Sequence, residues 1–238
     1  MPHVRVVCKA GKVVEVEEYY TRRALKKGLK REPNQKPTSE QQMKINEKNA
    51  VRDLTRILNT NFSETDYLVT YTYGCEEPPT VEFAKKEWQK LIRNTRNLCK
   101  RKGEAFKYVH VTEWKDKRIH HHMVMSIGSV DIREAKKLWK HGGVKIQVLD
   151  HSGQYKKIAA YLIKQTRKTF RDPDSPCKKR WTPSRNLKKP IITKTIVKAD
   201  SWRKTPKIWK NYTLEDLYTG YSDYTGYPYR KYSMIRKE

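Results

Sequence analysis

The hydrophobic and polar positions between residues 39 and 170 follow two alternating periods, one typical of helices and one typical of strands. Segments of helical period begin near Thr38 or Ser39, at Val81 and at Asp131, and a fourth covers about Gln154–Thr169. Segments rich in β-branched and aromatic residues, which favour strands, lie at 67–73, 106–114, 119–127 and 144–149. The predicted order of elements is therefore αβαββαβα.

Two of the predicted strands, 106–114 and 119–127, are joined by a short polar segment, which predicts a β-hairpin. Helices that alternate with strands around one hairpin favour a mostly antiparallel sheet flanked by helices. The sequence therefore predicts an α/β (α+β) fold with a ferredoxin-like or RRM-like core.

The two ends of the chain differ from this central part. Residues 1–20 predict a short hairpin, and residues 21–38 are basic and polar, as expected of an arm. Residues 171–238 are basic and rich in Tyr and Pro, and Ile191–Val197 is the strand that the pattern indicates there. The predicted organisation is a hairpin with a basic arm at 1–38, a central domain at 39–170, and a C-terminal extension at 171–238 that packs on or follows the core.

The net charge narrows the class of partner. The chain has 53 Lys and Arg against 26 Asp and Glu, which gives a net charge of +27. A polyanion is the expected partner, since each phosphate that a cation neutralises releases a counterion. No apolar run approaches the ~18 residues that a membrane span needs, and the N-terminus lacks the apolar core of a secretory signal. Charge alone leaves open a basic binding protein of ribosomal type. The 4 cysteines form no CxxC pair, as expected of reduced thiols in a cytoplasm.

Three consecutive histidines, His120, His121 and His122, lie in the second strand of the predicted hairpin. Residues i and i+2 of a strand share a face, so the side chains of His120 and His122 point together and that of His121 points away. Two neighbouring imidazoles are half of a metal site. The alternative interpretation is a row of half-buried strand histidines.

A carboxylate completes this set through the register of the hairpin. A turn centred on Asp116 and Lys117 pairs position 113 with 120, which places Glu113 opposite His120 on one face. A β-bulge would shift the register and separate them. Alone, Glu113 is more typical of a solvated ion pair; together with the two histidines it indicates a metal site.

Tyr161 and Lys164 form a further candidate pair. They lie three residues apart in the last predicted helix and so share one face of it. A nearby lysine favours the phenolate form of tyrosine, which is the better nucleophile. The alternative is a helix tyrosine packed under a strand, and this spacing alone is weak evidence of catalysis.

Three segments together carry a family resemblance: YLVTYTYG at 67–74, VTEW with RIHHHMVM at 111–125, and IAAYLIKQ at 158–165. In this order they resemble the motifs of the HUH endonuclease superfamily, in particular its Rep proteins, the rolling-circle replication initiators of phages and plasmids. The resemblance covers about residues 39–170 and the SRNL segment at 184–187, with His121 at the variable centre of the histidine motif. In relaxases of this superfamily the tyrosine precedes the histidines, whereas here it follows them.

The resemblance implies a site and a reaction. His120 and His122, with Glu113 as third ligand, would bind Mg²⁺ or Mn²⁺, and Tyr161 would attack single-stranded DNA at an origin. The products would be a 5′-phosphotyrosine and a free 3′-OH, and Lys164 would steady the nucleophile or the phosphate charge. A single nucleophile is implied, because Tyr155 is poorly spaced for a second. The implied setting is the cytoplasm of a bacterial cell, with a host polymerase and a host helicase, since the sequence has no GxxxxGK[ST] motif.

Two other functions are compatible with the sequence. A single-tyrosine HUH transposase would use the same chemistry at a different DNA site. A non-enzymatic nucleic-acid-binding protein with an RRM-like sheet would instead stack bases on Tyr71, Tyr73 and Tyr108. In each case the 21–38 arm and the basic run at 178–180 are candidates for contacts with the DNA backbone.

Overall fold

The computed structural model describes residues 1–22, 39–74, 77–114, 119–167, 169, 179–198, 203, 205–223 and 225–237. The expected arm after residue 22, the turn at 116–117, and Lys178 lie outside these residues. The chain divides into two compact units, which are described separately. One contains Met1–Asn46 with Lys189–Glu238, and the other contains Glu47–Lys188.

The unit at 47–188 is built on a five-stranded antiparallel sheet. Its strands are β3 (Tyr67–Thr72), β4 (Lys107–Glu113), β5 (His120–Ser126), β6 (Val144–Val148) and β7 (Thr182–Pro183), in the spatial order β6-β3-β5-β4-β7. The helices are α1 (Glu40–Asn61), α2 (Val81–Arg101), α3 (Ile132–Lys136) and α4 (Lys156–Gln165). The segment from β3 to β6 has the order βαββαβ of a ferredoxin-like core. The predicted fold class and the predicted order of elements are confirmed.

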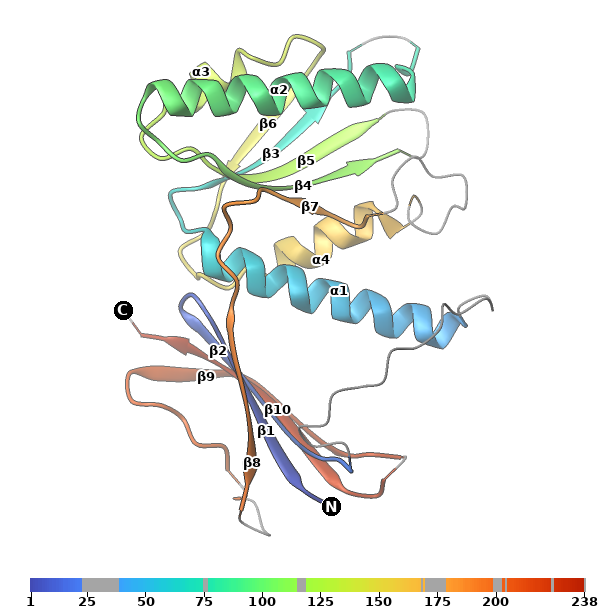
Figure 1. Cartoon of the computed structure of the whole chain (residues 1–238), viewed down its shortest axis with the longest axis vertical. Coiled ribbons are helices and arrows are strands. Elements are labelled where there is room, and N and C mark those ends of the chain that lie inside the picture. Colours follow the sequence, from blue (N-terminus) through green and yellow to red (C-terminus); the bar gives the residue numbers. More distant parts are fainter. Residues whose placement is uncertain are drawn as a thin grey trace. The chain divides into compact units, whose positions relative to one another are not determined.

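The helices cover both faces of this sheet (Figure 1). On one face α2 and α3 bury an aromatic-rich core that includes Tyr71, Trp88, Met123 and Trp139. On the other face α1 and α4 bury a core of smaller aliphatic residues that includes Val109, Val124 and Leu162. Because side chains alternate along a strand, β3, β4 and β5 each contribute to both cores.

Three of the helices, α1, α2 and α3, begin where the sequence supplies a capping residue. The hydroxyl of Ser39 accepts a hydrogen bond from the backbone N–H of Gln42 at 3.2 Å, one residue before α1 begins. Thr80 caps α2 through the N–H of Phe83 at 3.2 Å, and Asp131 caps α3. Such caps satisfy N–H groups that have no partner within the helix. After α2 the chain turns at Gly103, whose φ of 74° is readily adopted only by glycine.

The other unit is also built on a five-stranded antiparallel sheet. The expected hairpin is present as β1 (His3–Ala10) and β2 (Val13–Tyr20), and the expected strand at 191–197 is β8. β9 (Tyr212–Tyr221) and β10 (Pro228–Arg236) complete the spatial order β8-β1-β2-β10-β9. The N-terminal hairpin and the C-terminal extension thus form one sheet, which the sequence pattern did not predict.

A buried ion pair connects the two ends of the chain within this sheet. Glu18 on β2 accepts hydrogen bonds from the guanidinium Nε of Arg230 on β10 at 2.8 Å and of Arg5 on β1 at 2.7 Å. Burial alone would raise the pKa of Glu18. The hydrogen bonds and charges of Arg230 and Arg5 outweigh burial and hold that pKa below its ordinary value. Glu18 therefore remains ionised and paired, as a buried charge requires.

Candidate functional site

The predicted metal ligands lie together on neighbouring strands. Glu113 at the end of β4 pairs directly with His120 at the start of β5, and Val111 pairs with His122. This is the register that the sequence predicted. One ligand atom from each of Glu113, His120 and His122 lies within 4.8 Å of the other two. The three side chains therefore form a group that could hold a metal ion.

The ring of His122 fits the role of a metal ligand. Its Nδ1 lies 3.0 Å from the hydroxyl of Thr70 on the adjacent strand β3. Its Nε2 is buried and has no hydrogen-bond partner among the described residues. An unpaired buried nitrogen is costly, and coordination to a metal would satisfy it. A second partner on the opposite ring nitrogen, as Thr70 provides here, is the usual way in which a metal-binding histidine is oriented.

The protonation state of His122 favours the same role. Burial, and then the charge of neighbouring His120, lowers the pKa of His122 to about 4. The imidazole is therefore neutral at neutral pH and has a lone pair available. A neutral imidazole is the form that binds metal ions.

Tyr161 lies beside this group on α4. Its hydroxyl is 3.5 Å from Nδ1 of His122, and the two rings meet edge to face with centroids 5.4 Å apart. The inner side of α4 is held by buried Ala159, Leu162 and Ile163, while Tyr161 is 39% exposed. The nucleophile candidate is thus close to the candidate metal ligands and accessible from solvent. Lys164 lies one helical turn further along α4 and is exposed.

The expected lowering of the pKa of Tyr161 by Lys164 is not present in this structure. Burial raises the pKa of the phenol, a hydrogen bond with the side chain of Gln165 lowers it, and the charge of Glu113 raises it. The result lies above the ordinary value, so this part of the prediction is wrong. The physical reason is that desolvation of the phenolate dominates, and the nearest acidic ligand adds to it.

The middle histidine, His121, points to the opposite face of the sheet. It is fully buried and stacks on Trp88 of α2 with ring centroids 4.3 Å apart. Its Nδ1 lies 2.8 Å from the hydroxyl of Thr112, and its Nε2 lies 3.1 Å from that of Tyr73. Burial holds the pKa of His121 well below its ordinary value. His121 is therefore a neutral core residue with both ring nitrogens satisfied.

The tyrosines that an RRM-like binding surface would use are part of the protein core. Tyr71, Tyr73 and Tyr108 are all buried on the sheet face that α2 covers. An RRM stacks bases on exposed sheet aromatics, and these three do not form such a surface. Tyr155 is buried as well, and its hydroxyl donates to the carbonyl of Asp150.

Two neighbours of the site were not singled out from the sequence. Thr70 orients His122, and Gln165 contacts Tyr161. The signal for Gln165 is its position four residues after Tyr161, on the same helix face. Thr70 has no such local signal. Its position opposite His122 depends on the register between β3 and β5, and no turn joins these two strands directly.

One family model matches the central part of the chain. Residues 66–170 match the model of the family described as Replication-associated protein ORF2/G2P, a family of rolling-circle replication initiators. The matched segment includes every candidate site residue and covers just under half of the chain. No curated protein and no solved structure gives a significant match to the chain. Within the described residues, no helix is both long and apolar enough to cross a membrane.

Proposed function

We propose, on the premise that residues 66–170 carry the replication-associated ORF2/G2P domain, that this protein is a metal-dependent single-tyrosine endonuclease. It would nick single-stranded DNA at a replication origin and so initiate rolling-circle replication. The observation that carries the proposal is the convergence of Glu113, His120 and His122 with Tyr161, whose hydroxyl lies 3.5 Å from His122.

The donor set fits a divalent metal ion. Imidazole and carboxylate ligands suit Mn²⁺, and a site with few protein ligands that leaves room for a phosphate also suits Mg²⁺. A metal held by Glu113, His120 and His122 would polarise the scissile phosphate and fix its position. Thr70 would keep the ring of His122 in the orientation that binding requires.

The proposed step is a transesterification. The phenolic oxygen of Tyr161 forms a bond to phosphorus, and the bond from phosphorus to the 3′-oxygen breaks. The phenol proton leaves Tyr161, and the departing 3′-oxygen gains a proton. The products are a 5′-phosphotyrosine and a 3′-OH that a polymerase can extend, so the number of phosphoester bonds is unchanged.

Lys164 has a modified role in this proposal. Since the pKa of Tyr161 is raised in this structure, the lysine is better suited to pairing with the phosphate than to generating a phenolate. Lys164 is exposed and lies one turn from Tyr161, so its ammonium group can pair with a phosphate of the DNA backbone. Removal of the Lys164 charge should therefore slow cleavage without abolishing it.

A replication initiator and a transposase would use the same four residues, so the site itself does not distinguish them. The match to replication-associated proteins favours the initiator. The proposed partners are origin single-stranded DNA, a host polymerase and a host helicase. A non-enzymatic RRM-like binding protein is less well supported, since Tyr71, Tyr73 and Tyr108 are buried.

A covalent-adduct assay tests the proposal. The protein is incubated with single-stranded DNA that covers the origin of its own replicon and with Mn²⁺, and products are separated on a denaturing gel. We expect a protein–DNA adduct that EDTA and Tyr161→Phe both prevent. Tyr155→Phe is the matched control, because it removes a hydroxyl from the same region and should leave the adduct intact. An adduct that persists in Tyr161→Phe would assign the nucleophile to another residue.

A further inference from the structure

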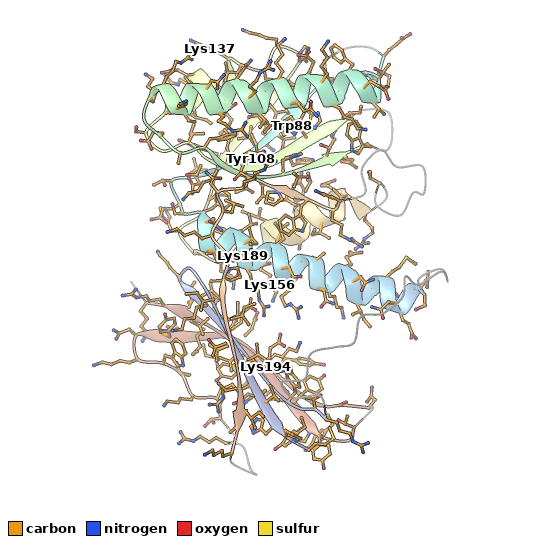
Figure 2. All side chains as sticks on the ribbon, in the orientation of Figure 1. Trp88, Tyr108, Lys137, Lys156, Lys189 and Lys194 are labelled. Carbon is orange, nitrogen blue, oxygen red and sulfur yellow. The ribbon has the colours of Figure 1, made fainter. Side chains whose placement is uncertain are left out.

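A cavity of about 520 Å³ lies in the unit at 47–188, between α2 and the side of the sheet formed by β4 and β7. Most of its lining comes from the sheet face that carries His121, opposite the face of Tyr161. Figure 2 shows two of the lining side chains, Trp88 on the sheet-facing side of α2 and Tyr108 on β4. The proposed nicking reaction uses none of the residues that line this cavity.

Aromatic rings form much of the cavity wall. Trp88, Tyr108, Trp114 and Trp181 all line it, and the ammonium of Lys85 lies 5.9 Å from the ring centroid of Trp114. Flat aromatic walls favour a flat aromatic ligand, since stacking gains more from such a ligand than from an aliphatic one. The volume is within the range of small-molecule sites.

Two hydrogen-bond donors at the cavity lack partners among the described residues. The indole Nε1 of Trp114 and the Nδ1 of His110 are both buried and unpaired. The indole N–H of Trp88 donates to Nε2 of His110 at 3.4 Å, so this nitrogen carries the lone pair. In the neutral ring the proton must then be on Nδ1, which makes it a donor. A ligand rich in acceptor atoms would satisfy both groups.

The charged residues of the cavity have one sign. Among the described residues, Lys85, Arg96 and Lys179 contribute to its lining, and no Asp or Glu does. Lys179 belongs to the basic run that the sequence indicated as a candidate for DNA contact. Cations next to aromatic walls form the combination that binds a base together with its phosphate.

We propose that this cavity binds one nucleotide of a single DNA strand, at a site separate from the metal centre. The base stacks against Trp181, a half-buried ring of the cavity wall, and its acceptor atoms take hydrogen bonds from Trp114 and His110. The adjacent phosphates pair with Lys85 and Arg96. This inference goes beyond the nicking reaction and does not depend on it, because the cavity residues and Tyr161 serve different steps.

The test measures binding without cleavage. In the full-length Tyr161→Phe protein with EDTA, fluorescein-labelled (dT)15 is titrated at several salt concentrations. The pocket variant Lys85→Gln/Arg96→Gln is compared with the control variant Lys86→Gln/Arg93→Gln. Both variants lose the same charge from exposed positions of α2, but only the first pair lines the cavity. A difference in affinity between the two variants therefore reports on the cavity and not on the total positive charge of α2.

We expect the pocket variant to bind (dT)15 roughly tenfold more weakly than the control variant. The slope of log affinity against log salt should fall by about 0.7 for each phosphate that the variant no longer neutralises. The affinity for fluorescein-labelled (dT)15 should also fall in Trp114→Phe, which keeps a ring but removes the N–H donor. Circular dichroism of each variant checks that the fold is retained.

A second titration with the mononucleotide dTMP shows whether the cavity binds a nucleotide within a DNA strand or a free nucleotide. Quenching by (dT)15 that depends on the pocket pair supports a site for strand DNA. Pocket-dependent quenching by dTMP, with equal (dT)15 affinity in both variants, would overturn the proposal in favour of a site for free nucleotides. Equal behaviour of both variants with both ligands would overturn it altogether. These results are independent of whether an adduct forms in the nicking assay.

Discussion

The two faces of β5 place identical side chains in opposite roles. His122 points towards α4, where its Nε2 has no partner among the described residues and Glu113 and His120 are close by. Its neighbour His121 points towards α2, where both ring nitrogens have hydroxyl partners and the ring stacks on Trp88. Both imidazoles are neutral at neutral pH because burial lowers the pKa of each.

The difference shows that neither residue type nor protonation state distinguishes a ligand from a core residue. What differs is whether the ring has a lone pair without a partner. His121 forms two hydrogen bonds and fills the aromatic core, so its contribution is to stability. His122 forms a contact on one side only, which leaves the other nitrogen for a metal. The comparison predicts that substitutions on the two faces affect different measurements.

The largest expected effect is on catalysis, from removal of a ligand on the α4 face. His120→Ala or His122→Ala should reduce Mn²⁺-dependent cleavage by more than about 100-fold, because the metal loses one of three protein ligands. Cleavage is measured on origin single-stranded DNA, and Mn²⁺ affinity by titration calorimetry. His120→Ala separates loss of metal binding from loss of stability more clearly than His122→Ala. His120 is only half-buried, so its loss should leave the melting temperature nearly unchanged. Unchanged Mn²⁺ affinity in both variants would remove the metal site from this face.

On the α2 face, a substitution is expected to lower stability and leave Mn²⁺ affinity unchanged. His121→Ala should lower the free energy of unfolding by about 3 kcal/mol, because it leaves a cavity beside Trp88 and removes one hydrogen-bond partner each from Tyr73 and Thr112. Urea unfolding followed by tryptophan fluorescence gives this value. If His121→Ala instead unfolded like the wild-type protein and lost Mn²⁺ affinity, the assignment of the two faces would be reversed.

Much of this comparison follows from the sequence. The alternation of a strand separates His121 from His120 and His122, and the short hairpin places Glu113 opposite His120, as the structure shows. The αβαββαβα order was also predicted, because each helix and strand has its own period of hydrophobic positions. These features depend on contacts that are local in the chain.

Long-range pairings could not be predicted in the same way. The contact of Thr70 with His122 needs the register of β3 against β5, which are joined through α2 rather than by a turn. The N-terminal hairpin is joined to β10 by strand pairing between distant segments, and the paired residues Glu18 and Arg230 are 212 residues apart. The raised pKa of Tyr161 depends on its burial against the sheet, which helical spacing does not reveal.

A smaller effect is expected from the residue that orients His122. Thr70→Val keeps the shape of the side chain but removes the hydroxyl 3.0 Å from Nδ1. Mn²⁺ affinity should fall by about 10- to 100-fold, the usual effect of losing such a partner. Thr70→Ser restores the hydroxyl and should recover most of the affinity. Equal affinity in the valine and serine variants would mean that the protein core alone orients His122.

A dependence of stability on pH is also expected from the α2 face. Burial lowers the pKa of His110 to about 4, from about 6.5 in the unfolded chain. Between these values the unfolded chain binds a proton that the folded protein does not, so stability falls as the pH is lowered from 6.5 to 4. One such histidine contributes a slope of up to about 1.4 kcal/mol per pH unit. His110→Gln keeps an acceptor for the indole of Trp88 but cannot titrate, and urea unfolding between pH 4.5 and 6.5 should therefore show a shallower slope. The carboxyl of Glu18 titrates in both the wild-type protein and His110→Gln, so its contribution cancels in the difference between their slopes. Equal slopes in the two proteins would mean that water reaches His110 and that burial does not lower its pKa.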